Sequence, residues 1–244
     1  MAPWSHTGGF RCLLVLCVDL LCLGAGDGGQ KQPRFPPIAC REHLAWVAER
    51  YFHARGHAAE VGVFQGEFAM MNLRVWTGKY FCIDAWRHRK DGSRDKNVRW
   101  AYWHLRNLRV ARENLGFSGN RSVFVRKYSK EAAGSFPEEF FDWLYLDASH
   151  TEEDVTADLR AWWPRLRRGG LFSGHDYMDA NQTWLLLPGN RAPKNDYDPA
   201  RRHRFGVVRA LQAFAAEVGG LIQVTFVNDG NGCDDKPSWY MVKP

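Results

Sequence analysis

The sequence has no Cys-x-x-Cys pair, which argues against a structural zinc site. It also has no apolar run long enough to span a bilayer, because the run from Cys12 to Leu23 is short and Asp19 interrupts it. Neither sign of charge dominates. The net charge is only +6, and cations and acids interleave along the chain, so we expect no nucleic-acid partner. Internal repeats and low-complexity blocks are absent, which favours a single folded domain.

The first 26 residues have the layout of a secretory signal peptide. Arg11 precedes the apolar run, and small residues follow it near Ala25. Residues 27–37 are rich in glycine and proline, so we interpret them as a linker and place the domain at residues 38–244. The leader predicts entry into the secretory pathway or export without a transmembrane anchor. A plastid transit peptide is the alternative.

Few cysteines remain outside the leader: Cys40, Cys82 and Cys233. An odd number allows at most one internal disulfide. The favoured pair is Cys40 with Cys233, since Cys82 lies inside an apolar strand pattern. Two sequons, at Asn120 and Asn181, would accept glycans in the secretory pathway.

Apolar spacing alternates between strand and helix periods along the domain. Strands are predicted at 57–64, 79–86, 122–127, 141–148 and 169–177, with closing strands at 221–227 and 238–244. Helices are predicted at 38–55, 66–76, 98–115 and 206–218, and a short helix followed by a turn is predicted at 130–140. A further helix is predicted after the strand at 141–148, with one apolar face made of Val155, Leu159, Trp162, Trp163 and Leu166. This alternation indicates an α/β domain whose mostly parallel sheet has helices on both faces and one antiparallel strand near an edge.

A glycine turn follows the first predicted strand. Gly62 and Gly66 lie between that strand and a helix, and Glu60 lies at the end of the strand. The turn lacks the third glycine of the dinucleotide fingerprint and the Lys-Ser/Thr of a P-loop, so a ligand without phosphates fits better. Asp84 ends the second strand about twenty residues later, where a carboxylate can accept hydrogen bonds from both ribose hydroxyls.

Polar side chains also follow two later strands. Asp147 and His150 come after the strand at 141–148, and His175 and Asp176 come at the end of the strand at 169–177. The carboxyl ends of parallel strands meet at one edge of the sheet, where ligands bind. We therefore expect these four side chains to lie together beside the glycine turn.

Five blocks carry a resemblance to a known family: EVGVFQGEFA, FCIDAW, YSKEAA, DWLYLDASHTEEDVTADLRAWWPRLRRGGLFSGHDY and FGVVRALQAF. In this order, over roughly residues 42–218, they resemble the class I S-adenosylmethionine-dependent methyltransferases, and most closely methyltransferase family 24. The resemblance implies a Rossmann-like, seven-stranded, mostly parallel sheet with one antiparallel strand. It also implies S-adenosylmethionine as the cofactor.

The resemblance assigns roles to particular residues of this sequence. Glu60, Gly62 and Gly66 would border the methionine part of the cofactor, Asp84 would hold the ribose and Ser129 would lie near the adenine. Asp147 is expected to contribute both to this cofactor site and to the catalytic group.

Two chemistries stay open for the methyl transfer. In metal-dependent relatives, carboxylates at these strand ends bind Mg²⁺, so Asp147 and Asp176 are the candidate ligands. His175 departs from that pattern and favours a metal-free reaction in which it is the general base, with Asp147 and Asp176 as its catalytic partners. His150 is expected either to join this group or only to hydrogen-bond backbone or cofactor.

The function predicted from the sequence is methyl transfer to a small-molecule or glycan acceptor, at a hydroxyl group. Two alternatives stay open: an exported, non-catalytic interaction protein that retains the scaffold, and a nucleotide-binding oxidoreductase. Neither the acceptor nor the oligomeric state follows from the sequence.

Overall fold

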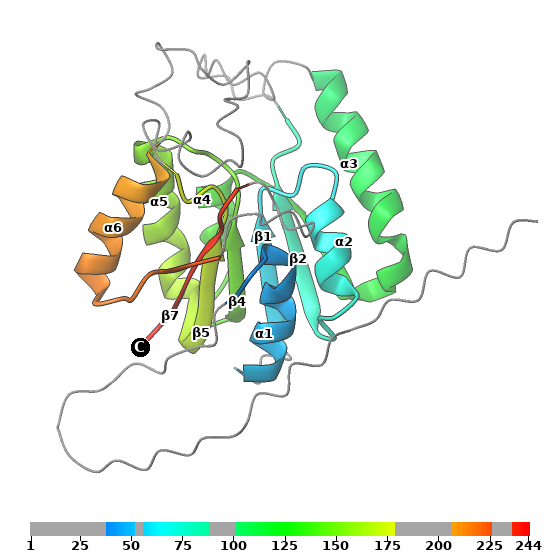
Figure 1. Ribbon diagram of the computed structural model, residues 1–244. Coiled ribbons are helices and arrows are strands. Elements are labelled where there is room, and N and C mark those ends of the chain that lie inside the picture. Colours follow the sequence, from blue (N-terminus) through cyan, green and yellow to red (C-terminus); the bar gives the residue numbers. More distant parts are fainter. Residues whose placement is uncertain (1–37, 52–55, 88–100, 179–205, 226–235) are drawn as a thin grey trace, which may run out of the picture. The chain divides into compact units, whose positions relative to one another are not determined.

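The computed structural model describes residues 38–51, 56–87, 101–178, 206–225 and 236–244 (Figure 1). These residues belong to a compact unit, Arg34–Pro244. The predicted leader and linker lie outside the described residues, as do Cys233 and Asn181. Within the described part of the chain, no helix is long and apolar enough to cross a bilayer.

Seven strands form one sheet in the order β3-β2-β1-β4-β5-β7-β6. The strands are β1 (His57–Val61), β2 (Lys79–Asp84), β3 (Ser122–Arg126), β4 (Phe141–Leu146), β5 (Leu166–Gly174), β6 (Gln223–Val224) and β7 (Trp239–Val242). Strands β1 to β5 pair in parallel, and β7 is antiparallel to both β5 and β6. The predicted mostly parallel sheet with one antiparallel strand near an edge is confirmed. The strand order reverses between β1 and β4, which is where open α/β sheets bind ligands.

Helices cover both faces of the sheet, as predicted (Figure 1). One face carries α1 (Leu44–Tyr51), α2 (Glu67–Leu73) and α3 (Ala101–Leu115), and the other carries α4 (Ser129–Ala133), α5 (Glu152–Trp162) and α6 (Val207–Val218). Alternating residues of a strand enter the two cores, because successive side chains point to opposite faces. In β2, for example, Cys82 packs on the α1–α3 side and Ile83 on the α4–α6 side.

The start and end of α5 follow from local chemistry. Its N-cap residue, Thr151, accepts a hydrogen bond from the backbone N–H of Asp154 at 3.2 Å, and three acidic residues lie in its first turn. The helix gives way to a short 3₁₀ segment, Trp163–Arg165, because Pro164 has no N–H to continue the ladder. The prediction that Leu166 lies on the apolar face of this helix was therefore wrong, since Leu166 is the first residue of β5.

The predicted helix at residues 38–55 begins as a short 3₁₀ turn, η1 (Arg41–His43), before α1. Cys40 precedes η1 with an extended backbone and is disulfide-bonded. Cys82 is a free, buried thiol in β2, in accordance with its predicted place inside a strand.

Candidate active site

The glycine turn after β1 lies directly against the end of β4. Gly62 has a φ of 97°, and a Cβ at this position would lie 1.8 Å from the carbonyl oxygen of Asp147. The backbone N–H of Asp147 in turn donates to the carbonyl of Val61 at 2.7 Å. Gly66 has a φ of 76° and faces Ala111 of α3. The glycines therefore allow close backbone approach, and this approach places the turn beside Asp147.

Asp84, at the end of β2, is bound to the same turn. Its Oδ2 accepts hydrogen bonds from the backbone N–H groups of Val63 at 3.1 Å and Phe64 at 3.0 Å, and its Oδ1 accepts from that of Trp86 at 2.7 Å. Burial raises the pKa of Asp84, and these three hydrogen bonds oppose the rise. Each carboxylate oxygen has two lone pairs, so Oδ1 can also accept from a hydroxyl group of a ligand.

Glu60 lies beneath the turn, on the α2 side of the sheet, and only 3% of it is exposed. The Tyr80 hydroxyl donates to its Oε2 at 2.8 Å, and the Asn72 amide donates to that hydroxyl at 2.8 Å. Burial raises the pKa of Glu60 to about 8. Glu60 is thus largely protonated at neutral pH, and its side chain belongs to a buried hydrogen-bond chain.

Ser129 is the first residue of α4, directly after the loop that follows β3. Its hydroxyl donates to Oδ1 of Asp158 at 2.6 Å and accepts from the indole N–H of Trp162 at 2.8 Å. Both partners belong to α5, so Ser129 joins α4 to α5. Its role near an adenine stays a prediction.

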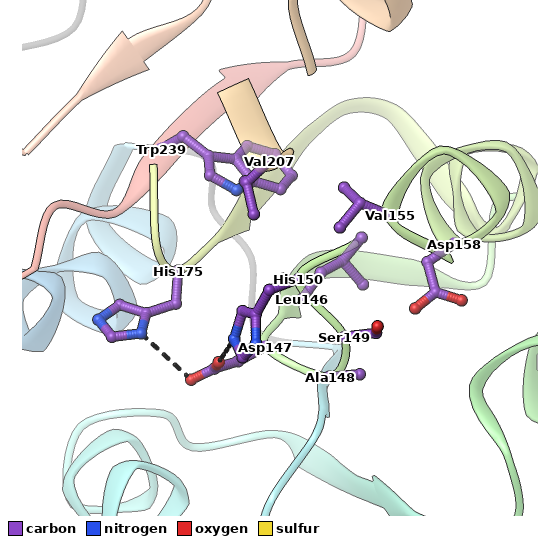
Figure 2. Close-up of a pocket in the computed structure, with 10 residues that line it drawn as sticks. All are labelled: Leu146, Asp147, Ala148, Ser149, His150, Val155, Asp158, His175, Val207 and Trp239. Atoms are coloured by element: carbon purple, nitrogen blue, oxygen red, sulfur yellow. Dashed lines mark ion pairs between the residues drawn. The ribbon is translucent and has the colours of Figure 1, made fainter. Parts of the chain in front are cut away.

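The four polar side chains predicted at the ends of β4 and β5 do lie together. Nε2 of His150 is 2.7 Å from Oδ2 of Asp176, and Nδ1 of His175 is 3.5 Å from Asp147 and 3.6 Å from Asp176. Figure 2 shows Asp147 between the two imidazoles, at one side of a pocket that α5 and Trp239 of β7 also line. We refer to Asp147, His150, His175 and Asp176 as the His–Asp cluster.

Charge in the His–Asp cluster is balanced by pairing. Burial lowers the pKa of His150, but the neighbouring carboxylates of Asp147 and Asp176 outweigh the effect of burial and raise this pKa to about 10. Burial raises the pKa of Asp176, yet the neighbouring imidazoles of His150 and His175 outweigh burial and hold the pKa of Asp176 well below its usual range. At neutral pH His150 is therefore a cation and Asp176 an anion.

Two more cations reach the cluster from elements distant in the sequence. Nη1 of Arg41, in η1, is 3.8 Å from Oδ2 of Asp147, and Nζ of Lys236, just before β7, is 3.5 Å from Oδ1 of Asp176. Sequence reasoning missed both residues. No local motif marks either one, because their proximity to the site follows from how η1 and β7 pack beside β4 and β5.

The residues of the cluster fit a magnesium ion poorly. One ligand atom from each of Asp147, His175 and Asp176 lies within 4.8 Å of the others. However, Mg²⁺ takes oxygen ligands, and this set includes an imidazole. Asp176 is also already paired with His150 and Lys236. The two candidate carboxylates lie together as predicted, but magnesium is not supported, and we derive no step through it.

One family model matches the central part of the chain. Residues 59–177 match the model of the family Methyltransf_24, described as a methyltransferase domain. This match includes every site residue predicted from the sequence, whereas Arg41 and Lys236 lie outside it. No curated protein matches the chain.

Solved structures with the same fold are similar at low sequence identity. Cofactor-bound Rv0187 from MTB gives a TM-score of 0.55 at 17% identity, over 83% of this chain and 78% of that chain. The O-methyltransferase from Bacillus cereus, in complex with SAH, gives 0.53 at 12% identity, over 83% and 80%. The O-methyltransferase TomG from Streptomyces achromogenes, in complex with SAM, gives 0.51 at 14% identity, over 84% and 80%. At these identities the structures establish the fold.

Proposed function

We propose that this chain methylates a hydroxyl group of a small molecule or glycan, because it has the class I methyltransferase fold and residues 59–177 match the model of a methyltransferase domain. The observation that carries the proposal is the position of the His–Asp cluster, directly beside the glycine turn through the contact of Gly62 with Asp147. The O-methyltransferases of similar fold support hydroxyl oxygen as the acceptor atom. The oxidoreductase and the non-catalytic scaffold receive no such support.

S-adenosylmethionine fits the residues at the ends of β1 and β2. The Asp84 carboxylate suits a ribose hydroxyl, because Oδ1 keeps one lone pair after it accepts from the backbone N–H of Trp86. The turn at residues 62–66 would border the methionine part of the cofactor, and Ser129 would lie toward the adenine. The bound cofactor supplies an electrophilic methyl group on a sulfonium.

The chain's own residues would orient the acceptor and remove its proton. With Nδ1–H of His175 directed at Asp147 and Asp176, the lone pair of the neutral imidazole is on Nε2. We assign Nε2 as the base that would take the proton of the acceptor hydroxyl as its oxygen receives the methyl group that the bound cofactor would supply. Asp147 and Asp176 hold the imidazole in this tautomer and stabilise its protonated form, as the acid does in a nucleophile–base–acid triad.

His150 has a different role from His175. Because its pKa is raised to about 10, it is protonated at neutral pH and cannot take a proton from the acceptor. We assign it to neutralise Asp176, with Lys236 on the other carboxylate oxygen.

We also propose that the protein works in the secretory pathway or outside the cell. The disulfide at Cys40 supports this location, since disulfides persist in oxidising compartments. Asn120, the first sequon, is exposed at the end of a 3₁₀ segment, as a glycan acceptor must be.

Isothermal titration with S-adenosylmethionine tests the cofactor assignment. We expect micromolar binding by the wild type and a loss of about tenfold or more in Asp84→Asn, which keeps an oxygen for the turn but loses the charge that strengthens the hydrogen bond to the ribose. Glu67→Gln, an exposed acid in the first turn of α2, is the matched control and should bind normally. Absence of binding by the wild type would contradict the proposal.

A turnover screen across acceptor classes tests the reaction itself. S-adenosylhomocysteine release should depend on a hydroxyl compound. Activity that requires an amine or a thiol, with none on alcohols or phenols, would show that oxygen is the wrong acceptor atom.

A further inference from the structure

We infer that Arg41 binds the carboxylate of the methionine part of S-adenosylmethionine. The inference rests on the proposed function, and it adds a cofactor-binding residue that lies outside the matched family region, residues 59–177.

The position of Arg41 carries the inference. Its guanidinium carbon lies 4.9 Å from the ring centroid of Phe68, which is the second residue of α2 and follows the glycine turn. Its Nη1 is 3.8 Å from Oδ2 of Asp147, whose carbonyl oxygen faces Gly62. The guanidinium therefore lies close both to the start of α2, which follows the turn, and to Asp147, which contacts the turn at Gly62.

Arg41 would supply a cationic partner for the cofactor carboxylate, which the residues of the turn do not offer. The methionine tail carries a carboxylate, whereas Val63, Phe64 and Phe68 offer it no cationic side chain. Within the described part of the chain, His150 and Lys236 lie 2.7 and 3.5 Å from Asp176, whereas the ion pairs of Arg41 with Glu42 and Asp147 are longer, at 3.8 Å each. An arginine suits the task because its planar guanidinium can donate two parallel hydrogen bonds to a carboxylate.

Arg41 is also held in place before any ligand arrives. It directly follows Cys40, which is disulfide-bonded, and its side chain is only 21% exposed. The guanidinium hydrogen-bonds the buried hydroxyl of Tyr145, which Ser238 also contacts at 2.9 Å. A cation fixed by a disulfide, an aromatic ring and a tyrosine loses little conformational entropy when it binds.

Two ligands that differ by the carboxylate alone test the inference. S-adenosylmethionine and its decarboxylated analogue are titrated into wild type, Arg41→Gln and Arg41→Lys, with binding measured by calorimetry. We expect the wild type to prefer S-adenosylmethionine by about tenfold or more, since a charge-assisted bidentate pair is lost with the analogue. In Arg41→Gln the preference should fall below about threefold, and Arg41→Lys, which keeps the charge without the fork, should be intermediate.

Arg50→Gln is the matched control. Arg50 is an exposed arginine of α1 that packs over Trp46, and its loss should leave the preference unchanged. The inference is overturned if Arg41→Gln keeps the wild-type preference, or if it weakens both ligands equally. A wild type that binds neither ligand contradicts the proposed function itself, so the two failures are distinguishable.

Discussion

Nε2 of His150 lies 2.7 Å from Oδ2 of Asp176, which joins the segment after β4 to the segment after β5. The two residues are far apart in the chain, and the parallel pairing of β4 with β5 brings them to one edge. Only 5% of the Asp176 side chain is exposed, against 36% for His150. The buried carboxylate therefore depends on a partner that reaches it from the solvent side.

Replacing His150 should lower the free energy of unfolding by an amount that depends on pH. We expect His150→Gln to lower the free energy of unfolding by about 1–2 kcal/mol at pH 7, because Asp176 loses a charged hydrogen-bond donor. The pKa of His150 is raised to about 10, so the stabilisation is full below its unfolded pKa of about 6.5 and is lost as pH rises through 10. Urea denaturation at pH 7, 8.5 and 10 should show that the difference in the free energy of unfolding between wild type and His150→Gln becomes smaller as pH rises. His43→Gln, at an exposed histidine of η1, is the control. A difference between wild type and His150→Gln that does not change with pH would contradict the pairing of His150 with Asp176.

His175→Gln tests the base. We expect the rate of methyl transfer to fall by about 100- to 10,000-fold, the usual contribution of a general base, while the affinity for S-adenosylmethionine changes by less than about threefold. Rates of S-adenosylhomocysteine formation, together with calorimetric binding, separate the two effects. Retention of the wild-type rate would assign the proton transfer to another group.

Metal removal distinguishes the two chemistries that the sequence left open. Since the cluster pairs its carboxylates with imidazoles, Arg41 and Lys236, we expect activity to survive dialysis against a chelator and to gain less than about twofold from added Mg²⁺. Activity that vanishes with chelator and returns with a divalent ion would establish a metal-dependent reaction instead.

The sequence predicted the fold well, because its signals are local. Strand and helix periods, the two glycines and the strand-end acids all fall within short stretches, and each strand places its polar end at the same edge of a parallel sheet. The boundary error at Leu166 came from extending a helical period past Pro164, where the missing N–H ends the helix.

The site was predicted only in part, because much of it depends on contacts between distant segments. The sequence predicted that Asp147, His175 and Asp176 meet at one edge of the sheet, but it could not distinguish the roles of His150 and His175. Both imidazoles lie near the same two carboxylates and differ in distance, since the distance to Asp176 is 2.7 Å for His150 and 3.6 Å for His175. Arg41 carries no local signal at all, since its position depends on η1 packing beside α2. The close approach of Gly62 to Asp147 likewise explains why residue 62 must be glycine, which the turn pattern alone did not show.

Glu60 gives a second pH dependence of the free energy of unfolding, which arises from an acidic side chain rather than from a basic one. Its pKa is raised by burial from 4.5 to about 8, so between these values the folded protein holds a proton that the unfolded chain releases. The free energy of unfolding should therefore fall as pH rises through this window, by up to about 1.4 kcal/mol per pH unit from this group. Glu60→Gln removes the titration but keeps an oxygen to accept the hydrogen bond of Tyr80.

The difference between wild type and Glu60→Gln isolates this one group, because every other titration is shared. We expect the two proteins to be similarly stable near pH 4.5 and the variant to be the more stable at pH 8, measured by urea denaturation at pH 5, 6.5 and 8. Glu67→Gln, at an exposed acid, should follow the wild type throughout. If the wild type instead gains stability relative to Glu60→Gln as pH rises, the pKa of Glu60 is lowered rather than raised in the folded protein, and its carboxylate is ionised there.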